Sequence, residues 1–412
     1  MAGLQPVRGT HDLLPDDFRR HRHVTETART VAESYGYAEV ATPIFEATDV
    51  FARSMGETSD VVSKEMYSFV DKGNEQVTLR PEYTAGICRA FISNGLTQHV
   101  PLKLFAHGPM FRYERPQKGR QRQFHQIDIE SIGAAEPEAD VEVITLAADI
   151  LDRLGVLDKC VLELNSLGDG ESRKAYRAVL VDYLEGHRGQ LSEDSLKRLD
   201  RNPLRILDSK DEGDRRIVAT APDIAGSFNA ASRDFFGAVQ DGLTAAGVAF
   251  RLSPRLVRGL DYYTHTAFEF VTDALGAQGT VIGGGRYDGL IEMLGGPPTP
   301  GIGWAGGVER LAMLAQNVPA APRPIALVPI GAQAEAAAQR LARDLRAAGF
   351  IVELGYRGNP GKRMKRANKL HASHAIMLGD DELAKGVAGV RDLDSGTQTE
   401  VPLTGLAAAL KA

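Results

Sequence analysis

GPMFRYERPQKGRQRQFHQIDIE, residues 108–130, is the most informative segment of this chain. Two runs with strand character flank a polar stretch, which predicts an antiparallel hairpin with a cationic tip. Such a tip suits a polyanion, either a nucleotide triphosphate or the end of a nucleic acid, whereas on charge alone a solvated basic loop is an equal alternative. The basic side chains of this stretch, residues 112–122, are Arg112, Arg115, Lys118, Arg120 and Arg122.

Other runs around this hairpin extend the prediction to a sheet. Residues 77–80, 102–114, 123–131 and 267–272 are apolar or alternating, which predicts antiparallel strands. A helix is predicted from Asp16 to about residue 35, because a proline and two aspartates stand at its start. Between about 170 and 253 the pattern turns to charged helical segments, so we expect a helical insertion there.

A second domain is predicted after the proline-rich segment NVPAAPRP (317–324). Strand-like runs at 325–330, 350–354 and 374–379 alternate with helical runs at 333–348 and 361–371. This alternation predicts an α/β domain with a mainly parallel sheet. The expected boundaries are a first domain over 1–318, a linker over 319–324 and a second domain over 325–412.

Composition restricts the class of protein only loosely. The 412 residues are 43% hydrophobic and 25% charged with a formal net charge of -6, an ordinary globular profile without global basicity. Cys88 and Cys160 form no CxxC pair, so we predict neither a disulfide framework nor a zinc cluster and assign no metal ligand. Neither a secretory signal nor a transmembrane segment is predicted, and we expect a cytoplasmic protein with no membrane partner.

Four further motifs have residues suited to ligand binding. LVRGLDYYTHTAFE (256–269) would line a polar pocket with tyrosines, although aromatic residues more often pack in cores. GGGRYDGLIEMLGG (283–296) has glycines that let backbone approach a ligand, or else form a plain turn, and it lacks the GxGxxG spacing of a Rossmann loop. GIGWAGGVERL (301–311) places Arg310 on a short helix, where it is either a site residue or a surface arginine. TLRPEYTAG (78–86) places an acid and a threonine after a strand.

Together these motifs resemble the class II aminoacyl-tRNA synthetases, and specifically the histidyl-tRNA synthetase family. The segments at 37–46, 108–130 and 301–311 resemble class II motifs 1, 2 and 3, and TLRPEYTAG resembles the amino-acid-binding loop. The segments at 256–269 and 283–296 resemble the two histidyl-specific peptides, and VRGTHDLLP (7–15) resembles the family's start. The resemblance extends from residue 7 to about 401.

The resemblance implies an α+β fold, ligands and partners. The catalytic domain would be an antiparallel class II sheet flanked by helices with a helical insertion, followed by a C-terminal α/β anticodon-binding domain. The implied reaction is ATP-dependent ligation of L-histidine to tRNA-His through a histidyl-adenylate, with Mg²⁺, in a homodimer whose interface contains Pro43. The rival is a catalytically inactive relative, the regulatory subunit of ATP phosphoribosyltransferase, which typically lacks the anticodon domain and parts of the ATP site.

Residue roles follow from the same resemblance. Glu130 and Tyr263 would read the imidazole, since a carboxylate and a phenol can pair with its donor and acceptor. Tyr83 stands where many family members have a small residue, and it either points away from the pocket or crowds it. The implied catalytic residues are Arg258 and Arg112. The implied histidine-binding residues are Glu82, Thr84, Gln126, Glu130, Arg258, Tyr262, Tyr263 and Tyr287. The implied ATP-binding residues are Arg112, Glu114, Arg120, Phe124 and Arg310. The implied tRNA-binding residues are Arg115, Gln117, Lys118 and Arg122 near the acceptor end, and Lys362 and Lys365 on the basic helix, which alternatively is only a solvated face.

Overall fold

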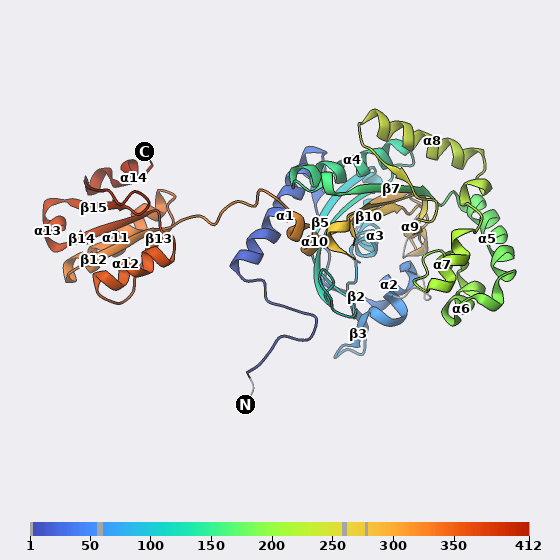
Figure 1. The fold of residues 1–412 in the computed structure, drawn as a ribbon, viewed down its shortest axis with the longest axis horizontal. Helices are drawn as coiled ribbons and strands as arrows, with labels where there is room; N and C mark the ends of the chain where they lie inside the picture. The colour runs from blue at the N-terminus through green and yellow to red at the C-terminus, as the bar shows by residue number, and fades with distance from the viewer. Residues whose placement is uncertain (1–2, 56–60, 258–261, 277–278, 412) are drawn as a thin grey trace. The chain divides into compact units, whose positions relative to one another are not determined.

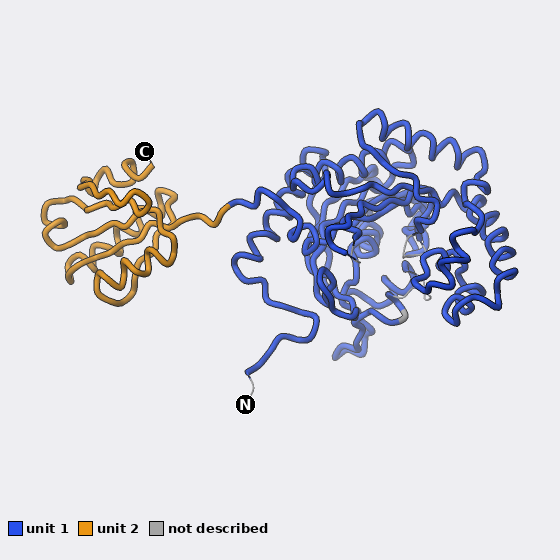
Figure 2. The backbone as a smooth tube through the Cα atoms, in the orientation of Figure 1, with its two compact units in different colours: residues 1–319 blue, residues 320–412 orange. Residues whose placement is uncertain are grey.

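The structure is a computed structural model that describes residues 3–411 apart from 56–60, 258–261 and 277–278. The chain divides into two units, residues 1–319 and residues 320–412 (Figure 2). Each unit has its own sheet and its own hydrophobic core.

A large sheet, eight-stranded within the described residues, forms the centre of the first unit (Figure 1). The six central strands are antiparallel, as predicted, while the two short edge strands pair in parallel with their neighbours. The strand order is β1 (Ala38–Glu39), β5 (Leu102–Phe111), β6 (Gln123–Ile132), β11 (Gly301–Gly307), β10 (Thr280–Arg286), β9 (Thr264–Val271), β7 (Val161–Ser166) and β8 (Arg251–Leu252).

The hairpin predicted from residues 108–130 is present. Strands β5 and β6 pair in register from Leu102 opposite Ile132 to Phe111 opposite Gln123, and residues 112–122 connect them. Side chains alternate across β6: Ile127 and Ile129 enter a core with the helices on one face, while Phe124 and Gln126 line a cavity on the other. The alternation of this one strand therefore separates the core of the domain from its candidate site.

Helices cover the core side of the sheet. They are α1 (Pro15–Ser34), α4 (Pro137–Arg153), α8 (Ala230–Ala245) and α10 (Val308–Leu314). Helix α1 begins with Pro15 at its first turn followed by two aspartates, as the sequence predicted. The fully buried guanidinium of Arg286 on β10 pairs with the buried carboxylate of Asp140 on α4, which fixes this helix to the sheet.

The opposite side of the sheet is covered by a small second sheet, short helices and the helical insertion. A small antiparallel sheet with the order β2 (Phe45–Ala47), β4 (Gln76–Leu79) and β3 (Tyr67–Val70) lies with α2 (Thr48–Met55), α3 (Thr84–Ser93) and α9 (Leu290–Met293). The predicted helical insertion contains α5 (Gly170–Glu185), α6 (Glu193–Arg201) and α7 (Glu212–Ala219), followed by α8. Buried side chains of the insertion such as Tyr176 and Leu180 join the same hydrophobic cluster as α3.

The second unit differs from its prediction in one respect. Strands β13 (Val352–Leu354), β12 (Ile325–Ile330) and β14 (His374–Gly379) are parallel, as predicted, with helices α11 (Ala332–Ala347) and α12 (Pro360–Lys369). The sheet continues with the antiparallel strands β15 (Val387–Asp392) and β16 (Gln398–Pro402), so it is mixed rather than mainly parallel. The polar, largely exposed sequence of β16 gave no strand signal. Short helices α13 (Asp380–Lys385) and α14 (Leu406–Ala409) complete this unit.

Candidate active site

A cavity lies on the side of the large sheet that faces away from α4. Its walls come from strands β6, β10 and β11, the connection between β5 and β6, and the first residues of α3 and α10. Most of the residues predicted for histidine and ATP line it. These are Glu82, Thr84, Arg112, Glu114, Arg120, Phe124, Gln126, Tyr262, Tyr263 and Arg310.

Three arginines form one wall of the cavity. The guanidinium of Arg112 donates from Nε to the carbonyl of Pro81 at 2.9 Å and lies 5.3 Å from the ring centroid of Phe124. Arg310 donates from Nε to the carbonyl of Gly119 at 3.0 Å, and Arg120 pairs with Glu114. Burial and the neighbouring charges of Arg120 and Arg112 lower the pKa of Arg310. Mutual repulsion of this kind is relieved by a bound polyanion such as a triphosphate.

Glu82 and Thr84 lie at the N-terminus of α3. Glu82 accepts hydrogen bonds from the backbone amides of Thr84 at 2.7 Å and Ala85 at 2.8 Å, so its carboxylate caps the helix. Burial raises the pKa of Glu82, and these amides together with Arg112 oppose that shift. The carboxylate is thus oriented toward the cavity by the helix that follows it, at a position suited to a small cationic group.

Glu130 lies beneath this part of the cavity as a fully buried carboxyl group. It accepts hydrogen bonds from the hydroxyl of Thr84 at 2.5 Å and from the hydroxyl of Tyr287 at 2.5 Å. Burial raises its pKa to about 8. Glu130 and Tyr287 do not line the open cavity. They lie behind Thr84, which separates them from the cavity surface.

Glycines of β11 make room for this cluster. A methyl group on Gly303 would lie 1.8 Å from the carboxylate of Glu130, and one on Gly301 would lie 2.2 Å from the ring of Tyr287. Only glycine fits at these two positions, because the opposing side chains occupy the space of a Cβ atom. In GGGRYDGL the first three glycines lie in the central strand β10 rather than in a turn, and Gly283 lines the cavity.

The tyrosines of the segment 256–269 connect the cavity to the insertion. Tyr262 and Tyr263 line the cavity with ring centroids 4.7 Å apart, and Tyr262 also lies 6.0 Å from Tyr287. The backbone carbonyl of Tyr263 accepts a hydrogen bond from Arg173 of α5 at 2.5 Å. Arg258, the other predicted catalytic residue, lies outside the described residues.

Tyr83 packs away from the cavity. Its side chain is 1% exposed, its hydroxyl donates to the carbonyl of His107 at 2.7 Å, and the guanidinium of Arg80 lies 4.1 Å above its ring. It is absent from the cavity lining. Of the two placements considered from the sequence, the structure therefore has the one that leaves the pocket uncrowded.

The residues predicted to contact tRNA are exposed, with the exception of Arg122. Arg115, Gln117 and Lys118 are exposed on the connection between β5 and β6. Arg122 instead stacks on Tyr113, with its guanidinium 3.7 Å from the ring centroid, and donates to the carbonyl of Glu114 at 3.2 Å. In the second unit, Lys362 and Lys365 of α12 are exposed.

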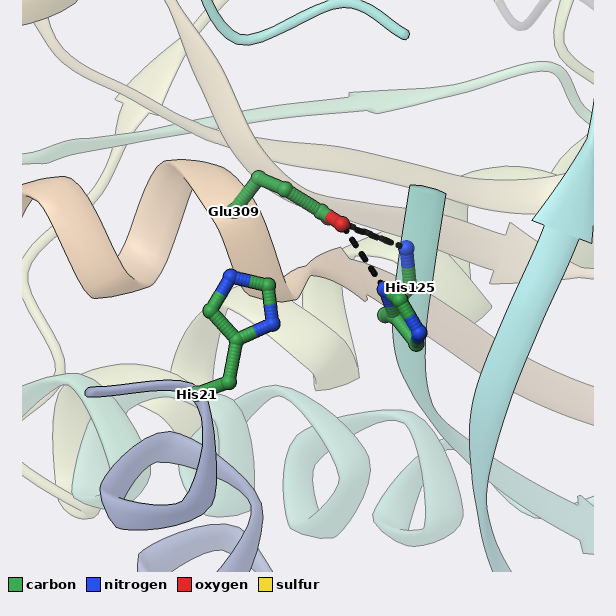
Figure 3. Close-up of side chains that lie close together, drawn as sticks. All are labelled: His21, His125 and Glu309. Atoms are coloured by element: carbon green, nitrogen blue, oxygen red, sulfur yellow. Dashed lines mark hydrogen bonds and ion pairs between the residues drawn. The ribbon is translucent and has the colours of Figure 1, made fainter. Parts of the chain in front are cut away.

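Several cavity residues were not assigned roles from the sequence. Trp304 and Ala305 lie on β11 within the motif at 301–311, whereas Thr280 and Val281 lie on β10 just before the motif at 283–296. The cavity lining also includes Gly119, Gln121, Gly307 and Glu309. No motif of the sequence includes His21, which lies near His125 and Glu309 (Figure 3).

Comparison with known proteins agrees with this geometry. The family described as histidyl-tRNA synthetase matches residues 9–311, and the one described as an anticodon binding domain matches residues 325–412. A histidine–tRNA ligase of Rhodospirillum rubrum is 63% identical over 404 residues, covering 98% of this chain and 97% of that protein. The solved structure of apo Staphylococcus aureus histidyl-tRNA synthetase has a TM-score of 0.84 at 35% identity and covers 100% of both chains.

One solved structure bears on the rival interpretation. A protein of Bacillus halodurans described as an ATP phosphoribosyltransferase regulatory subunit/histidyl-tRNA synthetase is 21% identical, with a TM-score of 0.68, and the match covers 91% of this chain and 98% of that one. At that identity the likeness shows the fold alone. The family match over residues 9–311 and the close full-length relative show more: this chain belongs to the histidyl-tRNA synthetase family.

Proposed function

We propose that this chain activates L-histidine with ATP and then transfers the histidyl group to tRNA-His. One observation carries the proposal: a single cavity has one wall of three arginines beside Phe124 and a second wall with Glu82 and Thr84, behind which the buried Glu130 lies. The first wall suits a nucleotide triphosphate, and the second suits an ammonium group and a polar side chain.

The two steps conserve atoms and charge as follows. A carboxylate oxygen of histidine attacks the α-phosphorus of ATP, the bond to the β-phosphate oxygen breaks, and pyrophosphate leaves. A terminal ribose hydroxyl of the tRNA then attacks the acyl carbon, the bond from that carbon to the phosphate oxygen breaks, and AMP leaves with the hydroxyl proton on its phosphate. Both steps gather negative charge on oxygen atoms, so fixed cations supply much of the catalysis. We assign this role to Arg112 and Arg258 at the α-phosphate, and to Arg120 and Arg310 at the outer phosphates.

The remaining assignments follow the same division of the cavity. Phe124 stacks on adenine, while Glu82, Thr84 and Gln126 hold the α-amino group. Glu130, supported by Tyr287, and Tyr263 beside Tyr262 select the imidazole. A site that pairs both ring nitrogens rejects analogues that lack them by about 10⁴-fold or more.

Mg²⁺ would enter with ATP. The buried carboxylate of Glu114 lines the cavity beside Arg120, and carboxylate and phosphate oxygens are ligands that Mg²⁺ prefers. When bound, the ion would neutralise charge on the phosphates. Glu114 is the residue we expect to hold it.

The regulatory-subunit alternative is less well supported. Arg112 and Arg310, which that inactive relative would have no need to keep, both line the cavity. The second unit matches an anticodon-binding family over residues 325–412, and the relative that is 63% identical is named as a ligase. We therefore assign catalysis to the first unit and anticodon binding to the second.

The setting of the reaction is also part of the proposal. None of the helices among the described residues is long and apolar enough to cross a membrane. Cys88 and Cys160 are free thiols, which persist in a reducing compartment. We place the enzyme in the cytoplasm as a homodimer.

Histidine-dependent exchange between ATP and labelled pyrophosphate tests the proposal. The wild-type protein should catalyse exchange, and Arg112→Ala should reduce its rate by about 100-fold or more, the size of effect expected for a fixed transition-state charge. Absence of exchange in folded wild-type protein would refute the activity.

A matched control distinguishes the loss of an arginine in the cavity from the loss of an arginine at the surface. Arg188 of the insertion pairs with nearby Glu185 at the surface, where its side chain is 50% exposed. Arg188→Ala removes the same charge and should leave the exchange rate within about twofold of wild type. Equal losses in the two variants would contradict the assignment of Arg112.

A further inference from the structure

A polar cluster lies between the core side of the large sheet and the candidate active site, whose cavity one of its residues, Glu309, also lines. It consists of His21 from α1, His125 from β6 and Glu309 from the first turn of α10 (Figure 3). Three elements distant in sequence thus each contribute one side chain. Because His125 follows Phe124 in the strand, its side chain points to the opposite face from the adenine-stacking residue.

The geometry of the cluster is that of an assembled ligand set. One nitrogen or oxygen atom from each residue lies within 4.8 Å of the other two. The carboxylate of Glu309 is already oriented by the backbone amide of His125 at 3.0 Å and by its Nδ1 atom at 2.9 Å. The ring of His21 approaches that of His125 edge to face, with centroids 5.6 Å apart.

The cluster is largely buried, but a groove connects it to solvent. The side chains of His125 and Glu309 are only 28% and 12% exposed. A groove bordered by His11, Asp17, His21, Lys118 and Glu309 leads to it from solvent. Asp17 lies one helical turn before His21 on α1 and borders the same groove, so a further oxygen ligand or a water molecule has room to approach.

We propose that His21, His125 and Glu309 form a binding site for a divalent transition-metal ion of the kind that prefers imidazole, Zn²⁺ above all. Two imidazoles and one carboxylate with a fourth position open to water is a known zinc ligand set. The ion would tie the N-terminal helix α1 to β6 and to the start of α10. Its role is to stabilise the first unit, and it is separate from Mg²⁺ bound with ATP.

Zn²⁺ binding to the full-length protein, stripped of metal with a chelator, tests the site. Calorimetric titration should show one tight site per chain, and Zn²⁺ should raise the melting temperature because a ligand that binds only the folded state stabilises it. Substitution by Co²⁺ should give the visible absorption bands of a tetrahedral or five-coordinate ion. Failure to bind either ion would overturn the proposal.

Two variants and a control identify the ligands. His21→Ala should weaken Zn²⁺ binding by at least about tenfold and abolish the thermal shift. His21→Gln, which keeps a polar side chain on the half-buried face of α1, should give the same loss if His21→Ala does not fold. His99→Ala removes an exposed histidine far from the cluster in sequence and should leave binding unchanged. Binding that survives both His21 variants would show adventitious coordination elsewhere and overturn the site.

Discussion

At the scale of single residues, Glu130 shows how burial sets chemistry. The carboxyl group is fully buried between the hydroxyls of Thr84 and Tyr287, and Gly303 leaves space for it. Burial raises its pKa from 4.5 to about 8, so the free protein keeps a proton there near neutral pH. The unfolded chain loses the same proton near pH 4.5.

This difference predicts a pH-dependent stability. The contribution of protonated Glu130 is complete below about pH 4.5 and is lost as the pH rises to about 8. Relative to Glu130→Gln, which cannot ionise, the wild-type free energy of unfolding should fall by up to about 1.4 kcal/mol per pH unit in this window. Urea unfolding of both proteins at about pH 5.5 and about pH 7.5 measures the difference. Parallel pH profiles would contradict the raised pKa.

At the scale of elements, helix α12 has two kinds of basic side chain: arginines in ion pairs within the unit, and exposed lysines. Asn359 caps it by accepting a hydrogen bond from the amide of Lys362 at 3.0 Å. Arg363 is buried and pairs with Glu335 at 2.6 Å, and Arg366 pairs with Glu353 at 2.5 Å. The basic sequence of this helix therefore serves two purposes: some cations hold it to the unit, while its lysines remain exposed.

The exposed lysines of α12 predict a selective effect on tRNA. Lys362→Ala combined with Lys365→Ala should lower kcat/KM for tRNA charging by about tenfold, and should make its salt dependence shallower by about one unit of slope per lysine, as for lost phosphate contacts. Pyrophosphate exchange should not change. Lys385→Ala, an exposed lysine on α13 of the same unit, is the control and should leave charging unaffected. Equal effects of both changes would indicate a general charge effect rather than contacts by α12.

At the scale of the whole molecule, the small sheet has exposed apolar side chains that a homodimer interface would cover. Ile44 and Phe45 are 44% and 58% exposed beside Pro43, and Phe69 and Val70 on β3 of the same sheet are 47% and 53% exposed. Exposed apolar side chains gathered on one small sheet are typical of an interface. The predicted homodimer would bury them.

Phe45→Glu tests that interface. A carboxylate buried there without a partner costs several kcal/mol, so the dimer Kd should rise by about 100-fold or more. Sedimentation equilibrium should give twice the mass of one chain for wild type and a mostly monomeric protein for the variant. Val179→Glu places the same charge on an exposed apolar residue of α5 and should remain dimeric. A monomeric wild type would refute the homodimer.

Local sequence determined much of this protein. Alternation along β5 and β6 and the proline and aspartates at the start of α1 each reflect a constraint within a few residues, so the antiparallel sheet and its cationic connection were predictable. The polar edge strand β16 was missed, because an exposed strand needs no apolar alternation.

Only the tertiary structure decided which side chains meet. The sequence left Tyr83 with two possible placements, and packing against Arg80 and His107 buries it away from the cavity. It gave no reason to connect His21 with Glu309, which are hundreds of residues apart and approach only because α1 and α10 pack together on the sheet. Patterns along a chain report local geometry and burial, whereas a contact between distant residues depends on how whole elements pack.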